Sequence, residues 1–362
     1  MRIVAARLHR FAIPLRDGFA TAAGTHARRE GLIIELVDDA GRTGLGEASP
    51  LPGLSAESLA AAETAARERC GALVGQELDA DLDAIRAALP APHEGPAATR
   101  CALETALADL AARAADLPLA RFLDPAAATS VPCNAVLPAD ATGCPPGYGI
   151  VKVKVGALDP AADRRRLETL FVATPPPVRF RLDANRAWTP RQALAVLSGL
   201  PADRIEYVEE PLAATHLDDL DEVHRRCGLL FALDETLADP RRWAEWLRSG
   251  SVGAVILKPT LLGGLSPALA LAAAARAANK QVVVTSTLET GVGVTACLHL
   301  AAAVATAPCG LDTLRLLDGT LLDEAPRIEG GVMGMPTEPG LGVTLDRRGL
   351  DTVAEFGGGS DG

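Results

Sequence analysis

The sequence predicts an α/β protein: a TIM-like (β/α)7β barrel over residues 125–314, with an α+β capping domain from residues 1–120 and part of the tail, 315–355. Three observations support this prediction. Short β-branched runs recur after about residue 131 with helical stretches between them, charged residues end many of these runs, and the first 120 residues instead show strands followed by helices. The 362 residues suffice for one barrel and one smaller domain.

The capping domain is predicted from its own pattern. Residues 2–14 and 31–37 are apolar or alternate, as strands do. Between them lies RDGFATAAGTHARRE, a Gly- and Ala-rich stretch of mixed charge that we expect to be a functional loop. Dense Gly and Pro in GRTGLGEASPLPGLS indicate turns. Leu and Ala at spacings of three and four then predict helices over residues 55–89 and 96–116.

The barrel is predicted from seven runs: VPCNAVL, GIVKVKV, VRFRLD, IEYVEE, LLFALDE, AVILKP and VVVTST. Most strand ends are separated by roughly 24–29 residues, the length of a strand plus a returning helix. Repeated units of this kind form a parallel sheet, and seven or eight of them close into a barrel. An open doubly wound sheet is the alternative, but no G-x-G-x-x-G follows the first strand.

The composition excludes several classes of function. The net charge of −11 argues against binding to nucleic acid or to an anionic membrane surface. The seven scattered cysteines include no C-x-x-C pair, which argues against a disulfide framework or a zinc knuckle. The N-terminus lacks an apolar signal core, and no long uncharged apolar run is present. We expect a soluble protein of the cytoplasm.

Three carboxylates stand at the ends of successive predicted strands: Asp183, Glu209 and Asp234. The carboxyl ends of barrel strands meet at one mouth, where these groups would repel one another and raise their own pKa values. A hard divalent cation with oxygen ligands removes that cost. The sequence therefore predicts a Mg²⁺ site, in which Mn²⁺ is expected to substitute. Glu210 and Glu235 neighbour these ligands but point differently, and we expect them at most to support the site.

Lys152 and Lys154 stand two residues apart in GIVKVKVG, so both side chains point to one face of the strand. The flanking valines face the helices, which turns the lysines toward the barrel interior, where lysines are rare unless paired or functional. Burial, a neighbouring ammonium and a metal would each lower the pKa of Lys154, as a general base requires. Lys258 ends AVILKP on the opposite side of the mouth and is the second predicted catalytic lysine. The alternative is a lysine pair on an exposed edge strand.

Other polar residues are predicted near the mouth. Arg181 shares the inward face of Asp183, and its buried guanidinium needs an anion partner, which is either a structural carboxylate or the substrate. Asn185 is expected to support the metal ligand next to it. Ser286 and Thr287 leave the seventh strand, and their hydroxyls with free backbone N–H groups predict an anion cradle for substrate. Ordinary helix capping is the alternative for either hydroxyl.

The set KVKVG, RLDANRAW, VEEP, LDET and LKPTLLGG, in this order and spacing, resembles the enolase superfamily. The K-x-K lysine and the opposed lysine resemble its muconate lactonizing subgroup. Within that subgroup, the chain is most similar to the o-succinylbenzoate synthases of menaquinone biosynthesis, through REGLIIEL, GEASPLPGLS, RCALETALADLA, RLDANRAWTP, ILKPTLLGG and GLDTL. These strings cover most of the chain, including the capping domain.

The resemblance implies Mg²⁺ on the three strand-end carboxylates, a substrate carboxylate bound to the metal, and a base that removes the adjacent proton. In the synthases, the lysine that matches Lys154 removes the proton and then assists departure of hydroxide from the same face. The lysine that matches Lys258 stays protonated and faces the π system of the intermediate. The match of Lys152 tunes Lys154 and contacts the carboxylate. The segment around residues 18–26 is expected to cover the substrate.

The chain departs from the synthases after the seventh strand, where TSTLET carries threonines and ETGVG resembles the N-succinylamino acid racemases. Two alternatives to the dehydratase therefore remain. One is a racemase of N-succinylamino acids or an epimerase of dipeptides, which would use both lysines on opposite faces of one carbon. The other is a non-catalytic barrel that binds a metal-chelated acid, although such a protein has no need of two opposed ammonium groups. The expected partner is a small carboxylate, and the oligomeric state is not predicted.

Overall fold

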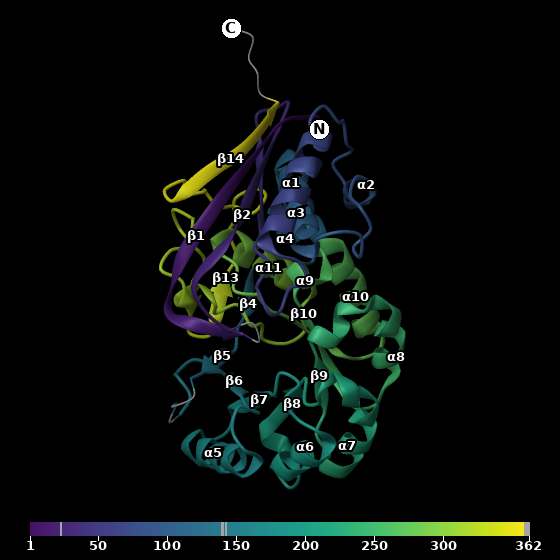
Figure 1. The fold of residues 1–362 in the computed structure, drawn as a ribbon, viewed down its shortest axis with the longest axis vertical. Helices are drawn as coiled ribbons and strands as arrows, with labels where there is room; N and C mark the ends of the chain where they lie inside the picture. Colours follow the sequence, from purple (N-terminus) through teal and green to yellow (C-terminus); the bar gives the residue numbers. More distant parts are fainter. Residues whose placement is uncertain (22–23, 139–140, 142, 358–362) are drawn as a thin grey trace.

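The computed structural model of the protein describes residues 1–21, 24–138, 141 and 143–357. Strands and helices of the N-terminal part precede a series of short strands and helices that fill the middle of the chain (Figure 1). The N-terminal elements are β1 (Ile3–Thr21), β2 (Gly24–Asp38), β3 (Thr43–Ala48), α1 (Leu59–Leu73), α2 (Leu82–Ala87), α3 (Ala97–Ala114) and α4 (Leu119–Leu123).

The N-terminal sheet is antiparallel and has the strand order β14-β1-β2-β3. Its outer strand β14 (Leu350–Gly357) comes from the other end of the chain and pairs with β1. Helices α1 and α3 lie along this sheet, apart from the helices of the lower half of the molecule (Figure 1). Gly44 and Gly46 in β3 allow α3 to pack closely against this strand. A Cβ on Gly46, for example, would stand 1.9 Å from the carbonyl oxygen of Ala102.

The predicted loop over residues 16–30 is instead mostly a β-ribbon. Strand β1 continues to Thr21 and β2 begins at Gly24, with Phe19 paired to His26 across a register shift after Pro14. The reason is that pairing within the hairpin satisfies the backbone polar groups of both segments, whatever their own weak strand pattern. The substrate cover expected at residues 18–26 includes two residues, 22–23, outside the described part, and it stays a prediction.

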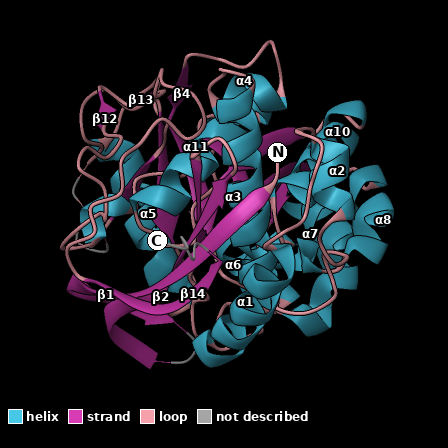
Figure 2. Ribbon diagram, turned by 90° about the horizontal axis from the view of Figure 1, so that it is seen from above, coloured by secondary structure: helices cyan, strands magenta, loops and turns pink. Residues whose placement is uncertain are grey.

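The second sheet is parallel, with the order β11-β10-β9-β8-β7-β6-β5, and it curls so that helices lie around its outside (Figures 1 and 2). Each run predicted to be a strand contributes to this sheet. The strands are β5 (Ala135–Leu137), β6 (Ile150–Lys154), β7 (Arg179–Asp183), β8 (Ile205–Glu209), β9 (Phe231–Leu233), β10 (Val252–Leu257) and β11 (Gln281–Val284). The helices are α5 (Pro160–Ala173), α6 (Pro190–Leu197), α7 (Leu220–Cys227), α8 (Trp243–Arg248), α9 (Pro259–Leu262), α10 (Leu265–Ala277) and α11 (Gly291–Val304).

Shorter elements complete the structure. A three-stranded sheet joins β12 (Ile328–Glu329), β13 (Val332–Gly334) and β4 (Ser130–Pro132). Short 3-10 helices occupy Ala202–Arg204, Ala214–Asp219, Glu235–Ala238, Pro240–Arg242 and Leu314–Leu316. The division of the chain at residues 120–125 and at residue 314 stays a prediction. Strand β14 pairs with β1 in the N-terminal sheet.

Both edges of the seven-stranded sheet bridge to one short segment rather than to an eighth full strand. Cys309 forms a parallel bridge with Cys133, and Gly310 forms one with Thr285. The N–H of Gly310 donates to the carbonyl of Val284 at 2.9 Å. The predicted seven parallel strands are thus present, and residues 309–310 occupy the gap between the first and the last of them.

Local signals begin and end the helices around the parallel sheet. Asp159 accepts hydrogen bonds from the first turn of α5, with Pro160 at its start. Thr189 and Gln192 form a capping box on α6, and Gly228 ends α7 in the left-handed conformation with φ 75°. These signals fix where each strand-helix connection begins, and therefore which residues stand at the strand ends.

The interior of the curled sheet is filled by a small apolar cluster: Tyr207, Ala232, Ala254, Ile256 and Val283. Alternate residues of the same strands point outward into the main core, as Val255 and Leu257 do in β10. All seven cysteines are free, as predicted, and most are buried. Within the described part of the chain, every helix is too short or too polar to cross a bilayer.

His299 in α11 ties three parts of the chain together. Its Nδ1 accepts the N–H of Ala120 at 2.9 Å, and its Nε2 lies 3.1 Å from the carbonyl oxygen of Leu341. Both contacts are satisfied by the neutral ring with its proton on Nε2. Burial lowers the pKa of His299 to about 4. The His299 imidazole therefore binds a proton less readily in the folded protein than in the unfolded chain.

We expect this histidine to make the fold sensitive to acid. The pKa of histidine in the unfolded chain is about 6.5. The contribution of neutral His299 to the free energy of unfolding is therefore fully present above that pH, and it is lost as the pH falls from about 6.5 to about 4. The loss corresponds to about 3 kcal/mol. His299→Gln retains one acceptor and one donor without a titrating group. Urea unfolding at pH 7, 5.5 and 4 should show a steeper loss for the wild type, and parallel profiles would contradict the assignment.

Candidate active site

The three predicted carboxylates stand on neighbouring strands at the same end of the sheet. Asp183 is the last residue of β7 and is paired in register with Glu209, the last residue of β8. Asp234 follows β9 directly. All three are buried, with exposed fractions of 1%, 1% and 5%. The βα repeat therefore places the three acidic residues at neighbouring strand ends, and their use as metal ligands stays a prediction.

Burial and neighbouring charges shift the pKa values of all three carboxylates. Burial and the negative charges of Asp183 and Asp234 raise the pKa of Glu209 to about 7, against the attraction of Lys152. Burial likewise raises the pKa of Asp234 to about 6. Burial opposes ionisation of Asp183 too, but the ammonium groups of Lys152 and Lys154 hold its pKa well below the usual range. Burial thus opposes ionisation at Glu209 and Asp234, and at Glu209 the other two carboxylates add to it.

Two partly buried lysines, with side chains 13% and 12% exposed, bind these carboxylates. The Nζ of Lys152 donates to Glu209 Oε1 at 2.8 Å and lies 2.8 Å from Asp183 Oδ2. The Nζ of Lys258, which directly follows β10, donates to Asp234 Oδ2. Burial opposes the charge of each lysine, but the adjacent carboxylates raise both pKa values above the ordinary lysine value. Both side chains are therefore held as ammonium groups at the strand ends.

Lys154 lies farther out than expected for a lysine inside the barrel. Its side chain is 53% exposed, against 13% for Lys152. The reason is that Lys154 is the last residue of β6, at the rim, whereas Lys152 is one pleat deeper. Its Nζ donates to Asp183 Oδ2 and to Asn185 Oδ1, each at 2.6 Å. Asn185 also donates its N–H to Asp183 at 3.2 Å, and its role in supporting a metal ligand stays a prediction.

Lys154 and Lys258 lie on opposite sides of the strand ends. Strands β7, β8 and β9 separate β6 from β10 in one direction around the sheet. In the other direction, β5, the Cys309–Gly310 segment and β11 separate them. A molecule placed over the carboxylates would therefore meet one ammonium group from each side.

The donor set of this site suits a hard divalent cation, because it consists of carboxylate oxygens at the ends of adjacent strands. In the structure, the ammonium groups of Lys152 and Lys258 bind oxygens of these carboxylates. Among the described residues, no three acidic, histidine or cysteine side chains converge closely enough to hold a metal ion. A bound cation would take the place of these ammonium contacts.

Arg181 lies deeper than the carboxylates and is bound by protein groups. Its Nε donates to Glu206 at 2.6 Å, and its Nη1 donates to Asn134 at 3.0 Å and to the carbonyl of Pro308 at 2.6 Å. Glu206 stands near the start of β8, away from the mouth. Of the two partners predicted for this guanidinium, the structure provides the structural carboxylate. A substrate contact for Arg181 stays a prediction.

The anion cradle predicted at Ser286 and Thr287 is wrong in its backbone part. The N–H of Ser286 donates to Gly310 O at 3.1 Å, and that of Thr287 donates to Glu289. Ser286 Oγ also contacts Gly310 and Thr313, whereas Thr287 Oγ1 is buried without a hydrogen-bond partner. Neither backbone N–H is free: a distant residue, Gly310, accepts that of Ser286, and a near neighbour, Glu289, accepts that of Thr287. A substrate contact for the two hydroxyls stays a prediction.

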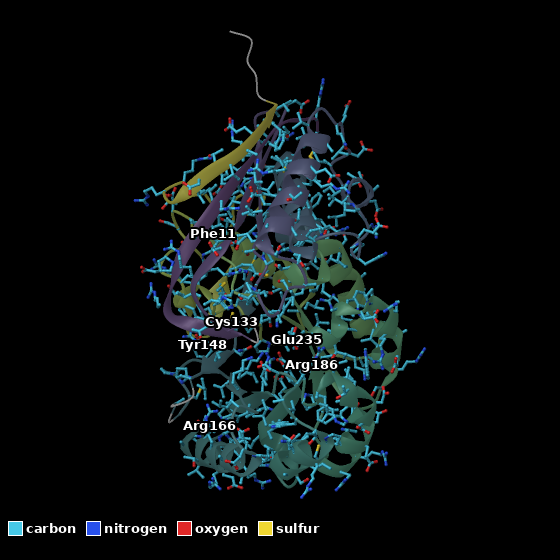
Figure 3. The ribbon with its side chains drawn as sticks, in the orientation of Figure 1. Phe11, Cys133, Tyr148, Arg166, Arg186 and Glu235 are labelled. Carbon is cyan, nitrogen blue, oxygen red and sulfur yellow. The ribbon has the colours of Figure 1, made fainter. Side chains whose placement is uncertain are left out.

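Glu235 joins the charged groups around Lys258. Burial raises its pKa, with Lys258 acting in the opposite sense, and its Oε2 is buried without a hydrogen-bond partner. Glu235 also lines a cavity of about 700 Å³ together with Arg186 and His93. Figure 3 shows Glu235 and Arg186 in the middle of the molecule, between the N-terminal sheet and the lower helices.

Sequence reasoning missed the role of Glu210, which is fully engaged within the site. Its carboxylate accepts the backbone N–H groups of Asp234 and Thr236, each at 2.8 Å, and the Nε of Arg186 at 3.0 Å. Sequence reasoning did not assign a role to Arg186 or Thr236. The available signal was the dipeptide Glu209–Glu210, in which adjacent acidic residues must point in different directions.

Comparisons with known proteins agree with this architecture. A parallel βα sheet with a capping sheet and a lysine–carboxylate centre defines the class of capped α/β-barrel proteins. A family model described as "Enolase C-terminal domain-like" matches residues 139–349, and one described as "MenC, N-terminal domain" matches residues 3–90. The chain belongs to the enolase superfamily, whose members are catalytic and share a TIM-like barrel with an N-terminal cap.

Individual relatives differ in their reactions. The o-succinylbenzoate synthase of Enterobacter sp. (strain 638) is 34% identical over 327 residues, covering 89% of this chain and 94% of the relative. The L-Ala-D/L-Glu epimerase of Bacillus subtilis (strain 168) is 30% identical over 358 residues, covering 95% and 97%. The structure of the Enterococcus faecalis dipeptide epimerase complexed with Mg and L-Leu-L-Tyr is 26% identical, with a TM-score of 0.85 and coverage of 95% and 100%.

Proposed function

We propose that the chain is an o-succinylbenzoate synthase. It would remove water from 2-succinyl-6-hydroxy-2,4-cyclohexadiene-1-carboxylate by a syn elimination, in menaquinone biosynthesis, with Mg²⁺ on Asp183, Glu209 and Asp234. The observation that carries the proposal is the pair of opposed lysines beside three adjacent carboxylates. The choice of reaction is supported by the 34% identity to the Enterobacter synthase and by the RLDANRAWTP and ILKPTLLGG motifs.

The residues of this chain divide the work by their positions. When bound, Mg²⁺ supplies a Lewis acid for the substrate carboxylate. Lys154, exposed at the rim, takes the proton from the carbon next to that carboxylate and returns it to the departing hydroxyl on the same face. Lys258, buried on the other side, keeps its proton and stabilises the negative charge that develops. Lys152 holds Asp183 and Glu209 in place.

The second candidate is an N-succinylamino acid racemase or dipeptide epimerase. The same opposed lysines favour it, since one would remove a proton from one face of a carbon and the other would deliver a proton to the opposite face. The Bacillus epimerase also aligns over more of this chain than the Enterobacter synthase does, 95% against 89%. Both candidates share the acidic site and differ in what Lys258 does.

One experiment separates the two candidates. The chain is incubated with Mg²⁺ and the cyclohexadiene precursor while the absorbance of the aromatic product is followed. In parallel, N-succinylamino acids and L-Ala-L-Glu are incubated in deuterated water and examined by NMR. We expect the aromatic product to form, with α-deuterium uptake slower than dehydration. Rapid α-exchange with no conversion of the precursor would overturn the synthase in favour of the epimerase.

Substitution of Lys258 provides a further test of its role. Lys258→Arg keeps the positive charge, but an arginine does not act as a proton carrier near neutral pH. A synthase should therefore retain measurable dehydration. An epimerase should lose α-exchange from one enantiomer and keep it from the other. Loss of exchange in one direction only would contradict the role of Lys258 as a permanent cation.

A further inference from the structure

Glu210 links the three loops that follow β7, β8 and β9. It stands at the end of β8, and its carboxylate reaches Arg186 in the loop after β7 and the N–H groups of Asp234 and Thr236 in the loop after β9. A further hydrogen bond comes from Thr236 Oγ1 at 2.8 Å. The three proposed metal ligands lie at these loops: Asp183 ends β7, Glu209 ends β8, and Asp234 directly follows β9. The side chain of Glu210 therefore joins its own connection, after β8, to the connections after β7 and β9.

The contacts saturate this buried carboxylate. Glu210 Oε1 accepts two backbone N–H groups, and Oε2 accepts one hydroxyl and one guanidinium, at an exposed fraction of 1%. Arg186 also donates from Nη2 to Thr236 Oγ1 at 2.9 Å, and its backbone N–H donates to the carbonyl of Glu210 at 2.7 Å. Such a network has one geometry that satisfies every group, so it fixes the positions of its members.

The backbone of the same residues is in conformations that need support. Glu210 has φ 41° and Arg186 has φ 59°, both in the left-handed region that non-glycine residues rarely occupy. Asp234 itself has φ −125° and ψ −90°. Asp234 contributes its carboxylate to the site and its N–H to Glu210, so the second contact sets the direction of the first.

We propose that Glu210 is a positioning residue that holds Asp234 against Glu209 so that both carboxylates bind one divalent cation. Arg186 fixes Glu210 in this task through its guanidinium. The inference rests on the proposed function, because it assumes the metal site at Asp183, Glu209 and Asp234. It predicts that loss of the Glu210 carboxylate weakens metal binding although every metal ligand is still present.

The test measures Mn²⁺ binding to the full chain without substrate, by electron paramagnetic resonance of the free ion. Glu210→Ala is expected to raise the Kd for Mn²⁺ by about 10–100-fold, the range seen when groups that orient metal ligands are removed. Glu210→Asp keeps the charge but is one methylene shorter, and it is expected to raise the Kd at least about threefold. Circular dichroism confirms that each variant is folded.

Glu104 provides a matched control. Its buried carboxylate likewise accepts a guanidinium, from Arg100, and the N–H and hydroxyl of Ser266, but it lies between α3 and α10. Glu104→Ala should lower the thermal midpoint and leave the Kd for Mn²⁺ within twofold of the wild type. A purely structural role for Glu210 predicts the same behaviour for its variants.

The outcomes separate this inference from the proposed function. If the wild type binds no Mn²⁺, or Asp234→Asn binds it as tightly as the wild type does, the proposed metal site is wrong and the inference falls with it. If the wild type binds Mn²⁺ and a folded Glu210 variant stays within twofold of its Kd, only the positioning role is overturned. Should Glu210→Ala fail to fold, Glu210→Asp decides the question.

Discussion

Replacing Lys154 with alanine is expected to lower turnover by roughly 10³–10⁴-fold, at the upper end of what general acid–base catalysis supplies. The side chain stands at the rim with its Nζ beside Asp183, on the side of the site opposite Lys258. The fold should survive, because half of this side chain is exposed and Lys152 still neutralises Asp183. The expected change in the free energy of unfolding is within about 1 kcal/mol. The measurement is kcat/KM with Mg²⁺ and the cyclohexadiene precursor, together with urea unfolding.

Lys280 provides the control for this substitution. Its Nζ donates to the carbonyl of Ser249 at 2.8 Å, and it precedes β11 at the opposite end of the sheet. Lys280→Ala removes a lysine of the same sheet but should leave kcat/KM within about twofold of the wild type. Turnover by Lys154→Ala within tenfold of the wild type would remove Lys154 from the reaction, and with it the proposed division of labour between the two lysines.

The fold of the parallel sheet could be predicted because each strand is buried on both faces and carries its own signal. Continuous apolar runs such as those around Ile256 and Val283 identify buried parallel strands without knowledge of their partners. The ribbon over residues 16–30 could not be predicted in this way, since its strand character depends on pairing across the hairpin. The same holds for β14, whose pairing with β1 joins the two ends of the chain.

The site shows the same distinction between local and distant information. Asp183 and Glu209 could be placed together because successive strand ends meet in any βα repeat. The N–H of Ser286 appeared free because its acceptor, Gly310, is 24 residues away in another segment. The partner of Arg181 stayed open for a related reason, since the sequence does not indicate which carboxylate lies at the same depth. Hydrogen bonds between distant loops depend on the tertiary structure, and local sequence patterns do not indicate them.

Glu47→Ala is expected to be the most destabilising of the substitutions considered, lowering the free energy of unfolding by about 3–5 kcal/mol. Glu47 lies in β3 and is 3% exposed. Its carboxylate accepts the N–H of Thr290 at 2.9 Å and its hydroxyl at 2.6 Å, and the N–H of Gly293 at 2.9 Å. These groups form the N-terminus of α11, where a negative charge is favoured. Alanine would leave the two N–H groups buried without partners.

The size of this effect depends on Arg29, which lies in the same interface. Arg29 is 1% exposed, donates to the carbonyl of Leu288 at 2.8 Å, and is attracted by Glu47 and Glu289. Removing one of its two counter-charges leaves a buried cation partly uncompensated, which costs more than losing a surface ion pair. Glu168→Ala provides the comparison, since Glu168 is 54% exposed, pairs with Arg164, and should cost within about 0.5 kcal/mol. A loss below about 1 kcal/mol for Glu47→Ala, measured by urea unfolding, would mean that this contact does not hold the N-terminal sheet to α11.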